Sequence, residues 1–180
     1  MLSWFAGNEK LAVRPSYIEI LRGFFGGMLS ILALLLLGQW SGHLFIMAPF
    51  GASCVLLYAV SQSPLAQPRN VIFGHFISAL VGLVFLKVFG VHILSIAAAV
   101  GVAIALMQWM RCVHPPAGAN PLVILLTANI THYSWSFLIF PVLLGTITLV
   151  AIAYCVNNFK AQQKWPNYGL AILVHKKNIN

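Results

Sequence analysis

Residues 20–40 read ILRGFFGGMLSILALLLLGQW, and Arg22 is the one charged residue in this apolar run. A helix needs about 20 apolar residues to cross a hydrocarbon layer of about 30 Å, so the run predicts a transmembrane helix. Three further runs, at residues 71–89, 92–110 and 136–156, are similar in length and nearly free of charge. The sequence therefore predicts an all-α polytopic membrane protein with four long transmembrane helices.

The amino-acid composition also indicates a membrane protein. Of 180 residues, 61% are hydrophobic and 7% are charged, whereas about a quarter of the residues in a soluble domain are charged. Both acidic residues, Glu9 and Glu19, precede the first long run. Without carboxylate side chains in its body, the chain cannot form the carboxylate acid–base pairs or carboxylate-bound metal sites of many enzymes. It also lacks a GxSxG or HExxH motif, so we expect no enzyme and no cofactor.

Two shorter apolar stretches, at 44–60 and 117–130, begin at sequence rich in proline and glycine. Because such residues disfavour a continuous helix before them, we expect two short or re-entrant helices. Hydropathy alone leaves open whether each of them crosses the bilayer or enters and leaves on one side.

The two short stretches resemble each other. Residues 49–53 (PFGAS) and 116–120 (PAGAN) share proline, glycine and alanine at an offset of 67 residues, since 116 − 49 = 67, and the same offset relates 71–89 to 138–156. The chain is therefore predicted to contain two pseudo-repeats of three helices each. Transporters with such repeats bind substrate between the copies, at broken helices. The pseudo-repeats cover about residues 20–89 and 92–156.

Basic residues flank the apolar runs at both ends of the chain. The positive-inside rule then places both termini in the cytoplasm, which requires an even number of crossings. Four spans plus two re-entrant helices meet this requirement, and so do six spans. With six spans Arg69 and Arg111 lie inside and the repeats are inverted; with four spans they lie outside and the repeats are parallel. The flanking basic residues are Lys10, Arg14, Arg22, Lys160, Lys164, Lys176 and Lys177.

We divide the chain into a cytoplasmic or interfacial segment at 1–19, a transmembrane domain at 20–157 and a basic interfacial tail at 158–180, with Trp165 as an aromatic anchor. The start of the chain lacks the features of a signal or transit peptide, so we expect a bacterial inner membrane protein. Its basic residues are scattered and form no stripe, so the lipid bilayer, and not nucleic acid, is the expected partner.

Small residues at helical spacing predict close helix packing at two places, 23–27 and 97–105. Such spacing lets helix backbones approach each other in lipid. We interpret both as packing faces within the bundle or between subunits, so a homo-oligomer is one interpretation of the sequence.

A short helix that begins at proline exposes unpaired N–H groups and a positive dipole end, which bind anions. If both short helices start near the middle of the membrane, their first turns face one site. Glycine there allows close approach of a small ligand, and Ser or Asn side chains add hydrogen bonds. The candidate residues are Pro49, Gly51, Ser53, Pro115, Pro116, Gly118 and Asn120.

Four ionisable residues are candidates beside this site. Arg69 and Arg111 are either fixed charges for the anion or markers of the membrane surface, and we favour Arg111 because His114 follows it by three residues. His114 can protonate to admit an anion, donate a hydrogen bond while neutral, or cap a helix. His75, inside an apolar run, is either functional or a satisfied core histidine. Cys112 and His114 lack further ligands at metal-site spacing, so no metal site is expected.

His114-Pro115-Pro116 followed by Ala-Gly-Ala resembles the motif that names the HPP family of integral membrane proteins. Residues 49–53 and 63–70 (SPLAQPRN) are similar to two further motifs of that family, and the resemblance covers about 15–157. It adds Asn70 to the candidate site, while Asn120-Pro121 departs from the small or hydroxyl residues expected there.

The resemblance implies four transmembrane helices and, because plant plastid members are regarded as nitrite transporters, transport of a small inorganic anion such as nitrite. The alternative is a non-transporting membrane subunit or a small-molecule sensor.

Overall fold

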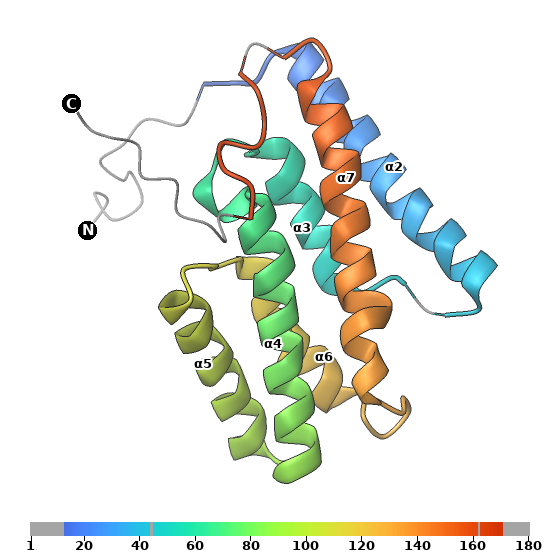
Figure 1. Ribbon diagram of the computed structural model, residues 1–180, viewed down its shortest axis with the longest axis vertical. Coiled ribbons are helices and arrows are strands. Elements are labelled where there is room, and N and C mark those ends of the chain that lie inside the picture. The colour runs from blue at the N-terminus through green and yellow to red at the C-terminus, as the bar shows by residue number, and fades with distance from the viewer. Residues whose placement is uncertain (1–12, 44, 162, 171–180) are drawn as a thin grey trace, which may run out of the picture.

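The computed structural model describes residues 13–43, 45–161 and 163–170, and the regular elements over these residues are all helical (Figure 1). The α-helices are α2 (Tyr17–Ser41), α3 (Ala48–Ala59), α4 (Pro68–Val88), α5 (Ile93–Trp109), α6 (Asn120–Leu126) and α7 (Leu144–Asn158). The 3₁₀ turns η1 (Pro64–Ala66), η2 (Pro115–Ala119) and η3 (Trp135–Leu138) precede α4, α6 and α7, and a π-helical turn, η4 (Ile139–Leu143), leads into α7. The predicted all-α class is confirmed.

Three helical segments are long and apolar enough to cross a membrane: Tyr17–Ser41, Pro68–Val88 and Trp135–Asn158. The remaining predicted long helix is α5, whose 17 residues span about 25 Å, less than a hydrocarbon layer of about 30 Å. The number of four long helices is therefore not confirmed. The helix is short because His92 caps its start through the Ser95 amide, and the chain turns at Arg111, where φ is 56°.

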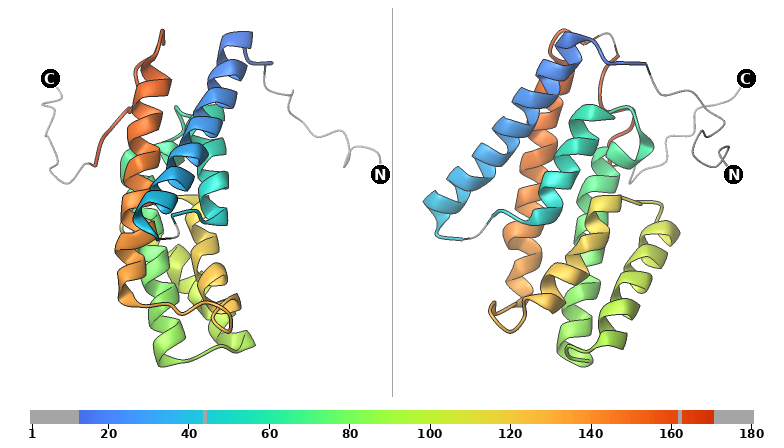
Figure 2. Two further views of the ribbon diagram at one scale, coloured as in Figure 1. Left: turned by 90° about the vertical axis from the view of Figure 1, so that its right-hand side faces the viewer. Right: turned by 180° about the vertical axis from the view of Figure 1, so that it is seen from behind.

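The two predicted short elements are present as α3 and as η2 followed by α6. Figures 1 and 2 show that both begin near the middle of the molecule and run in opposite directions, α3 toward the end where α2 begins and α6 toward the end where α4 ends. Pro49, Pro115 and Pro116 occupy first positions of these elements, where a missing N–H costs no hydrogen bond. Each short element therefore starts inside the bundle.

The helices form two units. In the first unit, α2 packs against α3 and α7; in the second unit, α4 packs against α5, η2 and α6. Figure 1 shows the first unit at the upper right and the second at the lower left. A hydrophobic core that includes Phe50, Leu83 and Leu149 joins the units, and smaller cores around Met107 and Leu125 lie within the second unit. We call the boundary between the units the seam.

Close packing in the second unit depends on small residues of α4. A Cβ atom added at Gly74 would lie 2.8 Å from the Cβ of His114, and one added at Gly82 would lie 2.8 Å from Ile124 Cδ1. Between them, the Ser78 hydroxyl donates to the Ala117 carbonyl. Because Gly74, Ser78 and Gly82 lie four residues apart on one helix face, they let η2 and α6 lie directly against α4.

With one exception, the glycines of the packing faces predicted at 23–27 and 97–105 lack the close contacts seen at Gly74 and Gly82. A Cβ atom added at Gly23, Gly27 or Gly101 would meet nothing within 4 Å. Only Gly26 of the first stretch packs closely, against the ring of Tyr58. The interpretation of the Gly23, Gly27 and Gly101 faces as packing surfaces within the bundle is therefore wrong, and their role between subunits stays a prediction.

Candidate functional site

Four polar side chains from three parts of the chain meet inside the bundle. Ser53 lies in α3, His75 in α4, His114 directly before η2, and Asn120 at the start of α6. The relative exposure of each of these residues is 0%. We call these four residues the buried cluster. It lies at the seam, because α3 belongs to the first unit and the other three elements to the second.

His75 is at the centre of the buried cluster. Ser53 Oγ lies 2.8 Å from His75 Nε2, and Asn120 Nδ2 lies 3.1 Å from His75 Nδ1 and 3.0 Å from the His75 carbonyl oxygen. Ser53 and Asn120 are the residues that the offset of 67 relates in the sequence. Each short helix thus contributes one polar side chain, and the two bind opposite nitrogens of the same imidazole ring.

The partners of the buried cluster determine where its hydrogens lie. A carbonyl only accepts, so Asn120 Nδ2 donates to the His75 carbonyl, and its second hydrogen faces His75 Nδ1. Neutral His75 therefore carries its hydrogen on Nε2 and donates it to Ser53. His114 Nδ1 lies 2.8 Å from the Leu65 carbonyl and donates to it, which leaves Nε2 as an acceptor 2.8 Å from Ser53 Oγ. The neutral cluster is a continuous donor chain from His75 through Ser53 to His114.

The same geometry has a place for one more proton. Ser53 Oγ lies 3.1 Å from the Pro49 carbonyl oxygen as well as beside the two histidines. If His114 Nε2 gains a hydrogen, it donates to Ser53, and the Ser53 hydroxyl turns to the Pro49 carbonyl. A hydroxyl accepts two hydrogen bonds and donates one, so every donor remains paired. The buried cluster can therefore take up a proton by a rotation of one hydroxyl.

A second polar group lies at the start of α4. Arg69 donates from Nη2 to the Met110 carbonyl at 2.9 Å and from Nε to the Arg111 carbonyl at 3.3 Å. These are carbonyls at the end of α5, which have no partner within their own helix. Asn70 Nδ2 donates to the Val113 carbonyl at 2.7 Å. Arg69 and Asn70 thus hold the segment that leads from α5 to His114.

Residues 163–170, which we call the strap, fold back over the start of α4. The Trp165 backbone amide donates to Asn158 Oδ1 at 3.0 Å, and the Asn167 amide donates to Gln67 Oε1 at 2.8 Å. The Tyr168 hydroxyl lies 2.9 Å from Asn70 Oδ1. The strap therefore joins the end of α7 to the start of α4 across the seam. Trp165, expected at the membrane interface, has a relative exposure of 1%.

Several predicted site residues lie outside the buried cluster. Pro49 contributes its carbonyl, and Pro116 is buried while Pro115 is exposed. A Cβ atom added at Gly51 or Gly118 would meet nothing within 4 Å, so both glycines border open space, and their contact with a ligand stays a prediction.

Arg111 is also outside the buried cluster, and its residue is exposed. Our preference for Arg111 assumed that the helix continues to His114, but α5 ends at Trp109. Arg69 is the arginine whose side chain binds the segment that leads to His114, through the Met110 and Arg111 carbonyls. Of the histidines at the ends of the runs, His43 and His132 are exposed and His92 caps α5, while His175 lies outside the described residues.

Over residues 13–43, 45–161 and 163–170, no group of three His, Cys, Asp or Glu side chains is placed to hold a metal ion. Cys54 and Cys112 are buried thiols and Cys155 is an exposed one.

Comparison with known proteins shows the family of the chain. The model of the family described as "HPP, transmembrane region" matches residues 12–166. The chain belongs to the HPP transmembrane family. As expected of an HPP-family chain, it is an integral, multi-pass membrane protein.

Two curated relatives come from Dictyostelium discoideum, and each is named only as a transmembrane protein. One is 34% identical over 89% of this chain and 54% of its own length, and the other is 38% identical over 68% of this chain and 45% of its own length. The chain thus spans about half the length of the curated relatives it matches. No solved structure matches it significantly.

Proposed function

We propose that this HPP-family protein moves a small inorganic anion across the membrane, with nitrite as the specific substrate, through the buried cluster at the seam. The observation that carries the proposal is that Ser53 and Asn120, one from each short helix, bind the two nitrogens of His75 in the middle of the bundle. Transporters commonly bind substrate where discontinuous helices meet between two structural repeats.

The helix directions support six passages in two inverted repeats, α2–α4 and α5–α7. In Figures 1 and 2, α2, α4 and α6 run one way and α3, α5 and α7 run the other way. Corresponding helices of the two copies are therefore antiparallel. The first unit then contains α2 and α3 of the first copy and α7 of the second copy. The second unit contains α5 and α6 of the second copy and α4 of the first copy. Rocking of one unit against the other opens the seam alternately to the two sides.

The distribution of basic residues supports one orientation of the bundle. Arg22, Arg69, Arg111 and Lys160 lie at the end where α2 and α4 begin and α5 and α7 end, whereas Lys87 lies at the other end of α4. The positive-inside rule assigns the first of these ends to the cytoplasm. A bacterial inner membrane stays a prediction, because the relatives described above come from a eukaryote.

The energetics of anion uptake favour coupling to a proton. Inward movement of one negative charge against 100 mV, negative inside, costs about 2.3 kcal/mol, and a proton carried with the anion removes this cost. No carboxylate side chain follows Glu19, so the buried histidines are the groups that take the proton. The ring centroids of His75 and His114 lie 5.1 Å apart, so one proton on the pair disfavours a second and leaves one positive charge for one anion.

The test is nitrite influx into proteoliposomes at about pH 6 and about pH 8. We expect wild-type influx to exceed that of protein-free vesicles and to rise at the lower pH. His114→Asn keeps a donor for the Leu65 carbonyl but cannot titrate, so its influx should not change with pH. Ser53→Ala should lower influx about ten-fold, because it removes the hydroxyl between the histidines. His132→Asn, at an exposed position, is the matched control and should behave as wild type.

A second candidate is a non-transporting membrane subunit or small-molecule sensor. The full burial of all four cluster residues favours it, because no ligand reaches the cluster without movement at the seam. Absence of influx for nitrite, nitrate, formate and chloride would contradict the transport proposal and favour this candidate. Influx that is identical in wild type and Ser53→Ala would place the pathway elsewhere in the bundle.

A further inference from the structure

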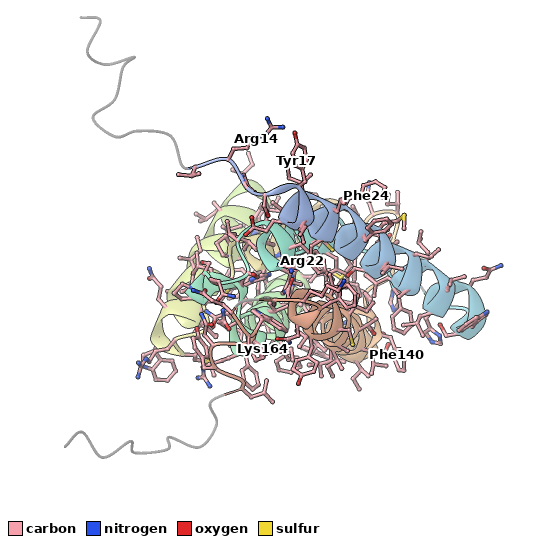
Figure 3. All side chains as sticks on the ribbon, turned by 90° about the horizontal axis from the view of Figure 1, so that it is seen from above. Arg14, Tyr17, Arg22, Phe24, Phe140 and Lys164 are labelled. Atoms are coloured by element: carbon pink, nitrogen blue, oxygen red, sulfur yellow. The ribbon has the colours of Figure 1, made fainter. Side chains whose placement is uncertain are left out.

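A polar cavity of about 500 Å³ lies away from the buried cluster, between the start of α2, the turn after α3 and the end of α7. A volume of this size is typical of a small-molecule site. Figure 3 looks down on this end of the molecule and shows Arg22 between α2 and α7, with Arg14 pointing away from the bundle. The cavity lining includes Ser16, Glu19, Arg22, Gln62, Asn157 and Lys160.

The cavity carries a net positive charge. Arg22 Nη2 donates to the Phe159 carbonyl at 3.1 Å, which holds the guanidinium in place and leaves most of its five N–H donors. Lys160 supplies a second cation. Glu19, the one carboxylate in the lining, has an oxygen that already binds the Ser16 amide and hydroxyl, each at 2.7 Å. The donors of Arg22 and Lys160 therefore suit a phosphate group.

Asn157 adds an independent sign of a ligand. Its relative exposure is 4%, and its Nδ2 donates to the Leu57 carbonyl at 2.9 Å. Its Oδ1 is buried and has no hydrogen-bond partner among the described residues. A buried acceptor without a partner costs about 1–3 kcal/mol, and Asn157 lines the cavity, so a ligand hydroxyl that reaches this oxygen would be stabilised.

An apolar groove of about 520 Å³ adjoins the polar cavity and shares Ile18, Arg22 and Lys160 with it. The remaining groove residues are Leu21, Phe25, Cys155, Val156 and Phe159. A cationic cavity with hydrogen-bonding groups, next to an apolar groove on the outer side of two helices, has the shape and chemistry of a lipid headgroup and its acyl chain. A small free anion in the cavity would leave the apolar groove unoccupied.

We propose that the protein binds one anionic phospholipid with a hydroxylated headgroup, of the phosphatidylglycerol type, between α2 and α7. Its phosphate lies between Arg22 and Lys160, a headgroup hydroxyl donates to Asn157 Oδ1, and an acyl chain lies along Phe25 and Cys155. This site does not depend on anion transport, because it involves none of the residues of the buried cluster.

Native mass spectrometry of the full chain in detergent tests the proposal. The protein is mixed with equal amounts of phosphatidylglycerol, phosphatidylethanolamine and phosphatidylcholine with identical acyl chains. We expect preferential retention of phosphatidylglycerol, and about five-fold weaker retention in Lys160→Gln, which removes one of the two cations. Arg14→Gln removes an exposed basic residue outside the cavity lining and should retain phosphatidylglycerol as wild type does.

A second measurement uses the unmodified protein. Cys155 lies in the groove and is the one exposed cysteine of the three. Added phosphatidylglycerol should slow the reaction of Cys155 with a maleimide in detergent, and phosphatidylcholine should slow it less. In Lys160→Gln, the difference between the two lipids should disappear.

Three results would overturn the proposal. Equal retention of the three lipids would mean nonspecific binding, and tighter retention of phosphatidylethanolamine would exclude the anionic class. Unchanged phosphatidylglycerol retention in Lys160→Gln with reduced nitrite influx would identify the cavity as an entrance for the anion. Since lipid retention is measured without a membrane gradient, its failure and the failure of the transport proposal are distinguishable.

Discussion

The two short helices both bind His75, but they are attached to the rest of the molecule in different ways. The second short element, η2 with α6, lies against the Gly74, Ser78 and Gly82 face of α4, and Asn120 binds both the His75 ring and the His75 carbonyl. In contrast, the polar contact of α3 with the cluster is the single hydroxyl of Ser53, beside an edge-on contact of the Phe50 ring with the His75 ring.

The other polar side-chain contacts of α3 lie within the first unit. The Tyr58 hydroxyl binds the Ser30 hydroxyl on α2, and the Leu57 carbonyl accepts from Asn157 on α7. We therefore expect η2 and α6 to move together with α4, whereas α3 has one polar bond point to the histidines, the Ser53 hydroxyl, and the apolar contact of Phe50. The seam is therefore the place where a change of protonation can become a movement.

Trp165 in the strap is a fully buried part of the core that joins the two units, and its removal should have the largest effect of the substitutions considered below. Trp165→Ala removes a buried indole, and we expect a loss of about 3–5 kcal/mol in the free energy of unfolding. Thermal unfolding in detergent, followed by circular dichroism, measures this loss. Trp109→Ala is the control, because Trp109 has a relative exposure of 81%. Equal shifts for both variants would mean that the strap does not hold the two units together.

Asn120→Leu tests the tight attachment of the second short element. The variant loses both bonds to His75 and leaves Nδ1 buried without a donor, while the His75 carbonyl keeps its helical partner. We expect a loss of about 2–4 kcal/mol in the free energy of unfolding, measured in the same thermal experiment. Asn129→Leu, at an exposed position of the loop after α6, should change the stability by less than about 0.5 kcal/mol.

Gly74→Ala and Gly51→Ala compare the same substitution on the two sides of the seam. A Cβ atom at residue 74 would lie 3.0 Å from the Cys112 carbonyl oxygen and 2.8 Å from the Cβ of His114, whereas one at residue 51 meets open space. We expect Gly74→Ala to destabilise the protein by about 1–3 kcal/mol.

Gly51→Ala should be neutral or stabilise by up to about 1 kcal/mol, because alanine favours helix. Loss of stability in Gly51→Ala similar to that in Gly74→Ala would show that α3 is packed as tightly as α6.

Much of this arrangement was accessible from the sequence. Apolar run length located the helices, and the prolines at 49, 115 and 116 located the starts of the short elements. The offset of 67 paired Ser53 with Asn120, and the scarcity of ionisable residues in the runs selected His75 and His114. That these four side chains share one network was not predictable, because contacts between distant residues depend on helix packing and leave no local periodicity.

Two premises of the sequence analysis differ from the structure for reasons of chain geometry. The spacing of three residues between Arg111 and His114 favours Arg111 over Arg69 only if helix continues between them, and the left-handed turn at Arg111 ends the helical relation. The spacing of the glycines at 23, 27 and 101 predicts packing faces within the bundle or between subunits, but within the bundle close contacts occur at other glycines, among them Gly26, Gly74 and Gly82. Small residues at regular spacing show that close packing is sterically allowed, and a neighbouring element decides whether it occurs. The sequence of the strap has an aromatic and basic composition but no pattern that predicts its fold over the start of α4.

The smallest effect that we expect concerns Tyr168, which ties the strap to α4 through a single hydroxyl hydrogen. The hydroxyl faces two acceptors, Asn70 Oδ1 and the Pro64 carbonyl, each at 2.9 Å. Only the protonated phenol can donate to them, and burial raises the pKa of Tyr168 while the nearby Arg69 lowers it less strongly.

Because the pKa of Tyr168 is raised in the folded protein, its hydroxyl contributes fully to stability below the pKa of about 10 that a tyrosine has in the unfolded chain. This contribution is lost as the pH rises through the folded-state pKa. Tyr168→Phe should cost about 0.5–1.5 kcal/mol at neutral pH, and the difference from wild type should shrink above about pH 10, where the wild-type phenolate repels both acceptors. Thermal unfolding of both proteins at about pH 8 and about pH 10.5 measures this difference in stability. A constant difference between the two proteins would mean that the Tyr168 hydrogen bonds do not hold the strap, and that its other contacts, such as the bond from the Asn167 amide to Gln67 Oε1, hold it.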